Sequence, residues 1–199
     1  MKRLEMISQY KSLPTEQIAL FIKQKKGNID IAAKVVPYNG DDEWIETLKN
    51  KWWSVHYEGS EDRPTGELSE LRDRLLSIGG CDVVLPVVED DIDNILKYGQ
   101  LWDNISSRLV KGRPCQCHSN SAELWYNNRD SSVTHGEFAL ILCTGYALSR
   151  DGLWRQHSWL VQAKPRSNVI IETTRGRVAY YGFGLTYAQA NEFYDMRSW

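Results

Sequence analysis

Four strand-like segments separated by turn signals occupy residues 136–183, and they constrain the fold of this 199-residue chain most strongly. Residues 136–148 are almost all apolar, which is typical of a central strand. An Asp-Gly pair at 151–152 and a proline-containing run at 164–168 predict turns on either side of a strand over 154–162. Further strands are predicted over 169–174 and 178–183. Short turns between successive strands favour an antiparallel sheet built from hairpins.

A helix is predicted on each side of these strands. Five residues that include Cys117 and Trp125 recur at i, i+3, i+4, i+7 and i+8, which places them on one helical face. The Asn-Asn-Arg-Asp run at 127–130 ends that helix, and a capping-box pattern at 186–189 begins another one that runs toward residue 196. The order helix, four strands, helix predicts an α+β fold.

The N-terminal part of the chain is predicted to be mainly helical. Apolar residues at helical spacing indicate helices within residues 1–36, 41–53 and 67–77. A short apolar strand over 83–88 and an acidic run at 89–91, which suits the positive end of a helix dipole, follow. We therefore expect a helical region over residues 1–104 that packs on a core over residues 105–199, the two forming one compact unit.

Composition and charge exclude several functional classes. Hydrophobic residues make up 42% of the chain and charged residues 25%, as in an ordinary soluble globular protein. The formal net charge of −2 provides no global attraction to nucleic acid or to anionic lipid. No apolar run reaches the roughly 20 residues of a membrane span, and the N-terminus has no signal-peptide core. We expect a cytoplasmic protein, with delivery by another export route left open, that acts on a protein or peptide-like substrate.

Three residues have the order and the predicted placement of a thiol catalytic triad. Cys117 falls in the first turn of its predicted helix, where the helix dipole favours a thiolate. His157 lies on a predicted strand and Glu172 on the next strand, so a hairpin would bring the two side by side. Cys117 is then the nucleophile, His157 the general base and later acid, and Glu172 the carboxylate that orients the imidazole.

Other residues around this triad are assigned supporting roles. The backbone N–H of Cys117 could hold an oxyanion together with a side-chain donor from Asn120 or Gln116, and the sequence does not choose between them. Aromatic and arginine residues near the triad in the sequence are expected to bind an anionic or sugar-containing substrate by stacking and ion pairing. The predicted substrate-binding residues are Trp125, Trp154, Trp159 and Arg155.

The cysteine segment offers two other roles, a metal site and a second candidate base. The Cys115-Gln-Cys117-His118 run does not have a usual zinc spacing, and no second Cys/His pair follows it, so no metal and no cofactor are expected. His118 should point about 100° away from Cys117 on the helix, which argues against it as the base. The other two cysteines, Cys81 and Cys143, have the surroundings of small core residues.

The order of cysteine, histidine and polar residue resembles that of the papain-like cysteine enzyme superfamily. Forty residues separate Cys117 from His157 and 15 separate His157 from Glu172, a compact spacing similar to the NlpC/P60 and transglutaminase-like branches. The sequence His157-Ser-Trp159 is similar to the His-x-Trp often found around the transglutaminase-type histidine. The third residue in those families is commonly Asp, Asn or His, so Glu172 departs from the pattern. The resemblance covers about residues 113–184.

The resemblance implies both a fold and a chemistry. The fold would be a papain-like core in which the helix with the nucleophile packs on an antiparallel sheet. The chemistry would be that of a peptidase, amidase, deamidase or transglutaminase, working on an amide or ester carbonyl through a thioester intermediate. The alternative is a non-enzymatic protein-interaction module that retains the fold. The natural substrate, the choice between hydrolysis and transfer, and the oligomeric state are not indicated.

Overall fold

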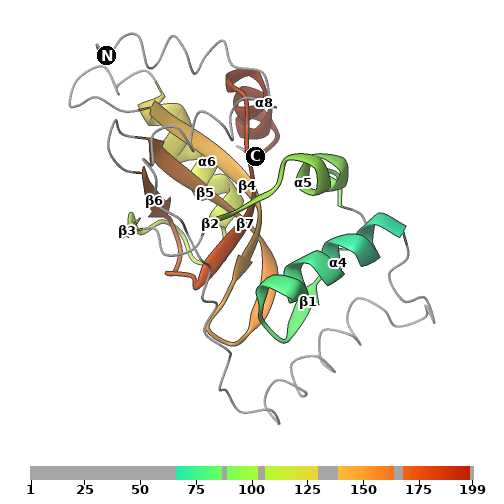
Figure 1. Cartoon of the computed structure of the whole chain (residues 1–199). Helices are drawn as coiled ribbons and strands as arrows, with labels where there is room; N and C mark the ends of the chain where they lie inside the picture. The colour runs from blue at the N-terminus through green and yellow to red at the C-terminus, as the bar shows by residue number, and fades with distance from the viewer. Residues whose placement is uncertain (1–65, 87–88, 103–105, 130–138, 164–167, 198–199) are drawn as a thin grey trace.

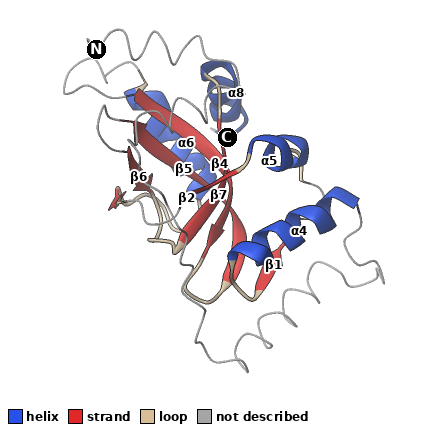
Figure 2. Cartoon of the chain, in the orientation of Figure 1, coloured by secondary structure: helices blue, strands red, loops and turns tan. Residues whose placement is uncertain are grey.

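The computed structural model describes residues 66–86, 89–102, 106–129, 139–163 and 168–197, and this part of the chain is α+β. The helices predicted within 1–36 and 41–53 lie outside the described residues. Four helices and a seven-stranded sheet are described (Figure 2). The helices are α4 (Gly66–Ile78), α5 (Ile92–Tyr98), α6 (Cys117–Asn128) and α8 (Tyr187–Arg197). The strands are β1 (Asp82–Val84), β2 (Gln100–Trp102), β3 (Ser107–Leu109), β4 (Ala139–Leu148), β5 (Leu153–Ala163), β6 (Asn168–Glu172) and β7 (Ala179–Gly184).

The predicted helices at 67–77 and 117–128, the four C-terminal strands and the last helix are confirmed to within a few residues. The hairpins β4–β5 and β5–β6 are antiparallel, as expected. The strand β7 does not continue next to β6 but returns to pair with β4. The predicted strand over 83–88 is the three-residue β1, which pairs in parallel with β5. The strands β2 and β3 were not predicted, because each has only three residues and is defined by its tertiary pairing.

The strand order β2-β7-β4-β5-β6-β3 places residues from both halves of the chain in one sheet (Figure 1). β1 and β2 come from before residue 105, and they pair with β5 and β7 respectively. Among the described residues, no helix combines the length and the apolar character that crossing a membrane requires.

Among the described strands, the middle of β5 has a neighbour on one side only. On its outer side, β5 pairs with β1 at residues 153–155 and with β6 at residues 160–163. Within the described part of the sheet, residues 156–159 therefore pair with β4 alone; we call this stretch the β5 gap. The first turns of α6 lie there, since the Ser121 hydroxyl donates a hydrogen bond of 2.9 Å to the free carbonyl of Ser158. The gap is thus the place where a helix start can approach the sheet.

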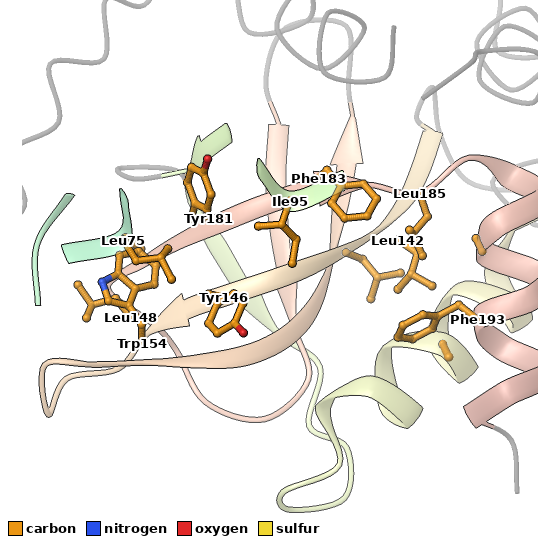
Figure 3. Close-up of a cluster of buried hydrophobic side chains, with 14 of the residues drawn as sticks. Leu75, Ile95, Leu142, Tyr146, Leu148, Trp154, Tyr181, Phe183, Leu185 and Phe193 are labelled. Atoms are coloured by element: carbon orange, nitrogen blue, oxygen red, sulfur yellow. The ribbon is translucent and has the colours of Figure 1, made fainter. Parts of the chain in front are cut away.

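The two faces of the sheet bury separate clusters. Alternate residues of β4 point to opposite faces, with Leu142 in one cluster and Cys143 in the other. The first cluster is the larger and includes residues of all four described helices, among them Leu75, Ile95 and Phe193 (Figure 3). The second cluster is rich in aromatic rings, and it holds Trp102, Trp159 and Tyr180. His157 belongs to this second face, because its ring lies over those of Trp159 and Tyr180.

A pair of glycines brings three strands close together beside His157. Gly145 of β4 lies opposite His157 of β5 and opposite Gly182 of β7. A Cβ added to Gly182 would overlap the carbonyl oxygen of Thr144, and Gly145 has a φ of +148°, which disfavours any side chain. The close approach of β4 and β7 therefore depends on both glycines.

We expect Gly182→Ala to lower the free energy of unfolding by about 1–3 kcal/mol, because the methyl group can fit only if β4 and β7 separate. Urea denaturation followed by circular dichroism measures this loss. Gly176→Ala is the control: nothing lies within 4 Å of a Cβ at that exposed position, so the change should be within about 0.5 kcal/mol. Equal effects of the two substitutions would contradict the close packing of these strands.

Candidate active site

Cys117 is the first residue of α6, and the loop that leads to it is held by hydrogen bonds. Val110 and Gly112 donate backbone N–H bonds of 2.8 Å each to the carbonyls of Glu172 and Thr173. The buried Asn120 accepts a bond of 3.0 Å from the Arg113 N–H and donates one of 2.7 Å to the Arg113 carbonyl. The loop therefore runs along the end of β6 and places Cys117 at the β5 gap.

His157 and Glu172 form a buried pair. The Nε2 of His157 lies 2.8 Å from the Oε2 of Glu172, and both side chains are only 1% exposed. The hydroxyl of Tyr180 donates to the same Oε2 at 3.1 Å. The other oxygen, Oε1, accepts bonds of 2.8 and 2.9 Å from the backbone N–H groups of Thr173 and Thr174, and one of 3.0 Å from the Thr174 hydroxyl. Five donors thus surround one carboxylate, which favours its charged form.

The charges of the pair follow from these contacts. Burial raises the pKa of Glu172, but the hydrogen bond and charge of His157, together with the bonds from Thr174, outweigh it and lower the pKa. Burial lowers the pKa of His157, but the hydrogen-bonding contacts of Cys117 and Glu172 outweigh it and raise the pKa. Both partners are therefore charged in the slightly acid range, as an imidazolium and a carboxylate.

The thiol of Cys117 is strongly acidified. Burial raises its pKa, but contacts with the imidazoles of His118 and His157 outweigh burial and lower the pKa to about 5. The Nδ1 of His157 is the ring nitrogen left over once Nε2 is bonded to Glu172, and it is buried without a hydrogen bond of normal geometry. Contact with this ring helps to lower the pKa of the thiol, and contact with the thiol helps to raise the pKa of the ring.

The His118 side chain lies closer to the Cys117 thiol than the sequence predicts. Its Nδ1 is 2.8 Å from the hydroxyl of Ser158, which in turn donates to the hydroxyl of Thr144 at 3.3 Å. The ring thereby stays beside Cys117 and helps to lower its pKa, although a separation of about 100° on the helix suggested that it points away. The sequence feature that could have indicated this position is the pair of hydroxyl residues Ser158 and Thr144, which lie opposite each other on β5 and β4 and hold the His118 ring.

The two predicted oxyanion donors are placed differently. Gln116 is exposed and occupies the N-cap position of α6, where it makes no side-chain capping bond. Its side-chain amide is therefore not used to cap α6. Asn120 is buried and its amide binds both backbone groups of Arg113, so its role here is to support the loop.

Three of the four predicted substrate-binding residues are fully buried. The three tryptophans have no exposed area, because the apolar sides of β5 and α6 are used for the core. Trp125 donates to the carbonyl of Leu140 at 3.2 Å and Trp154 to that of Gly79 at 2.7 Å. Trp159 packs edge-on against Trp102, with ring centroids 5.4 Å apart. Arg155 pairs with Asp151 through bonds of 2.9 and 2.7 Å. The three tryptophans therefore stabilise the core and do not face a substrate, whereas the Arg155 side chain stays 27% exposed while it pairs with Asp151.

No metal centre is evident within the described ranges, where no three His, Cys, Asp or Glu side chains are grouped to hold an ion. Comparison of the chain with protein-family models, curated proteins and solved structures found no match.

We expect Glu172→Gln to destabilise the protein by about 3–5 kcal/mol, because a carboxamide has one acceptor oxygen where the carboxylate has two. Its NH2 group must then face either the donors of His157 and Tyr180 or the backbone N–H groups beyond β6. The lowered pKa of Glu172 contributes stability above its ordinary pKa of 4.5, and this is lost as the pH falls through the folded value. The raised pKa of His157 contributes stability below its ordinary pKa of 6.5, and this is lost as the pH rises through the folded value. The cost of the substitution should therefore be largest between pH 4.5 and 6.5.

Chemical denaturation at several pH values measures this profile. The control is Glu123→Gln, which removes an ion pair with Arg113 whose side chains are 46% and 59% exposed. That change should cost about 0–1 kcal/mol. A cost for Glu172→Gln that does not depend on pH would contradict a charged pair.

Proposed function

We propose that the protein is a cysteine-dependent hydrolase or acyltransferase that acts on an amide or ester carbonyl. Cys117 is the nucleophile, His157 the general base and acid, and Glu172 the orienting carboxylate. The observation that carries the proposal is the buried His157–Glu172 pair, with 2.8 Å between Nε2 and Oε2, beside a cysteine at the start of α6. Contacts with the imidazoles of His157 and His118 lower the pKa of that thiol to about 5, against the effect of burial. A structural cysteine has no need of this arrangement, since burial alone raises a thiol pKa, as it does for Cys143.

The arrangement of elements supports a papain-like type of enzyme. The nucleophile begins a helix that packs on the sheet, the histidine lies on a strand, and the third residue ends the next strand. This order matches the peptidases, amidases, deamidases and transglutaminases that the sequence resembles near the NlpC/P60 and transglutaminase-like branches. The third residue, Glu172, differs from their usual Asp, Asn or His but supplies the same acceptor for the imidazole N–H.

The first half of the proposed reaction forms a thioester. The Cys117 thiolate attacks the carbonyl carbon, a C–S bond forms, and the carbonyl oxygen becomes an oxyanion. The backbone N–H of Cys117 is at the first helical position, has no acceptor within the helix, and is available to that oxyanion. The C–N or C–O bond then breaks, and the His157 imidazolium gives its proton to the leaving amine or alcohol.

The second half returns the thiol to its resting state. The now neutral His157 accepts a proton from water, or from an acceptor amine, as that nucleophile attacks the thioester. The C–S bond breaks, and the products are a carboxylic acid or a new amide together with the Cys117 thiolate. The bond to Glu172 keeps the His157 ring in one tautomer through both halves, with Nδ1 left for the thiol.

The pH dependence of Cys117 alkylation tests the proposed nucleophile. Iodoacetamide labelling followed by peptide mass spectrometry should give a midpoint near pH 5, with the reactive form lost as the pH falls below that value. His157→Ala should move the midpoint toward the value of about 8.5 of a free thiol. The rate at pH 6 should fall only about tenfold, because a thiolate with a higher pKa is intrinsically more nucleophilic.

Two comparisons sharpen this measurement. His118→Gln should also raise the midpoint, since it removes the other imidazole but leaves the His157–Glu172 pair intact. The exposed Cys115 in the same digest controls for access of the reagent. If wild-type Cys117 has the midpoint of a free thiol, or if His157→Ala leaves the midpoint unchanged, then Cys117 is not the nucleophile of a catalytic pair.

Acyl transfer itself distinguishes an enzyme from an interaction module that retains the fold. With p-nitrophenyl acetate we expect a burst of nitrophenol that approaches one equivalent of protein, and one acetyl group on Cys117 by mass spectrometry. Cys117→Ser should abolish both, and Glu172→Gln should slow the burst because the imidazole loses its orienting partner. A reactive Cys117 that forms no acyl adduct would favour the interaction module.

A further inference from the structure

The strand β3 forms an open edge of the described sheet (Figure 1). All three of its residues are exposed. Bonds from the N–H of Ile170 to the carbonyl of Ser106, and from the N–H of Val110 to the carbonyl of Glu172, show which residues face β6. The strand β3 pairs with β6 in parallel. In a parallel pair, the residues between those that bond to the neighbouring strand point their backbone groups to the opposite side. Ser107 and Leu109 therefore present N–H and C=O groups on the outer side, where no described strand pairs with them.

This edge leads directly to the candidate nucleophile. Leu109 lies opposite Glu172 in the β3–β6 pair, so the outer edge is one strand away from the carboxylate of the triad. The chain continues from β3 through residues 110–116 to Cys117, and most of that loop is exposed. An extended chain laid along β3 would therefore continue beside the loop toward the thiol.

The charge of this edge differs from that of the whole chain. The net charge of the protein is −2, yet residues 106–122 contain three Lys or Arg side chains and no Asp or Glu. Arg113 pairs with Glu123, whereas the exposed Arg108 and Lys111 have no ion-pair partner among the described residues. The side chain of Leu109 is 54% exposed and adds an apolar contact. Cations and strand groups that have no partner in the described part of the chain favour an anionic chain with a peptide backbone.

We propose that the outer edge of β3 binds an extended acidic segment of a protein substrate by β-strand addition. The inference rests on the proposed acyl-transfer function, and it names the class of substrate for that site. The backbone groups of Ser107 and Leu109 pair with the substrate main chain, and Arg108 and Lys111 attract its carboxylates. A nucleic acid would satisfy the cations but not the strand edge, because its phosphodiester backbone has no N–H donors.

Binding is measured on the full chain with Cys117→Ser, so that the result does not depend on thiol chemistry. The probe is a fluorescein-labelled (Glu-Val)₆ peptide, followed by fluorescence anisotropy at low salt. We expect saturable binding that weakens as salt is added, and no binding of the matched (Lys-Val)₆ peptide. The double variant Arg108→Glu/Lys111→Glu should weaken binding about tenfold. Arg150→Glu is the control for a charge reversal away from the edge, in the turn between β4 and β5, and it should leave binding nearly unchanged.

A second pair of variants separates strand addition from simple charge attraction. Leu109→Pro removes the outward N–H but leaves the bonds between β3 and β6, which come from the flanking residues. Leu109→Ala removes the same side chain but keeps the N–H. We expect Leu109→Pro to weaken peptide binding several-fold more than Leu109→Ala. Circular dichroism checks that both variants are folded.

The possible outcomes are distinct. Equal binding of both peptides, no effect of Arg108→Glu/Lys111→Glu, or preferential binding of a 12-nucleotide oligothymidylate would overturn the inference. If Cys117 alkylates with a midpoint near pH 5 but the acidic peptide does not bind, the catalytic proposal stands and the docking edge is wrong. If the peptide binds as described but Cys117 forms no acyl adduct, the edge is an interaction surface without the proposed enzyme.

Discussion

The hydrogen bond between His157 and Glu172, 2.8 Å long and almost fully buried, is the interaction on which the rest of the candidate site depends. Two buried charges cost several kcal/mol to desolvate unless each is paired and bonded. The carboxylate meets this requirement with five donors, of which two are backbone N–H groups just beyond β6. The imidazole is then held in one orientation, with its remaining nitrogen left for Cys117. Contacts with His118 and with this imidazole together outweigh burial and lower the pKa of the Cys117 thiol.

The sheet provides the space for these contacts. Because β5 has no outer neighbour at residues 156–159 in the described structure, the start of α6 can lie against it. The hydroxyl of Ser121 then satisfies the free carbonyl of Ser158, while the side chain of Ser158 holds the second imidazole, His118. On the other side, Gly145 leaves no side chain beside His157. The gap and the glycine are features of the fold that make the thiol and the imidazole neighbours.

Much of the fold could be predicted from the sequence, because apolar periodicity and turn residues are local signals. The two hairpins and the helix that starts at Cys117 are examples. The return of β7 to β4 and the short strands β2 and β3 depend on tertiary pairing, which local patterns do not encode. Cys117, His157 and Glu172 were placed by their order on predicted elements. Trp125 and Trp159 were predicted to bind substrate but are fully buried in the core. Their nearness to the triad in the sequence does not tell whether an aromatic ring faces the core or a substrate.

The protonation state of His157 at rest tests the central claim most directly. Nitrogen-15 NMR of the imidazole side chains, with His157 assigned from the spectrum of His157→Gln, reports whether one or both ring nitrogens carry a proton. A thiolate–imidazolium pair predicts that His157 is doubly protonated near pH 6. In Cys117→Ser the His157 pKa should fall, because the thiolate no longer stabilises the imidazolium. A singly protonated ring at pH 6 that does not change in Cys117→Ser would mean that the thiol is neutral at rest, and it would contradict the account.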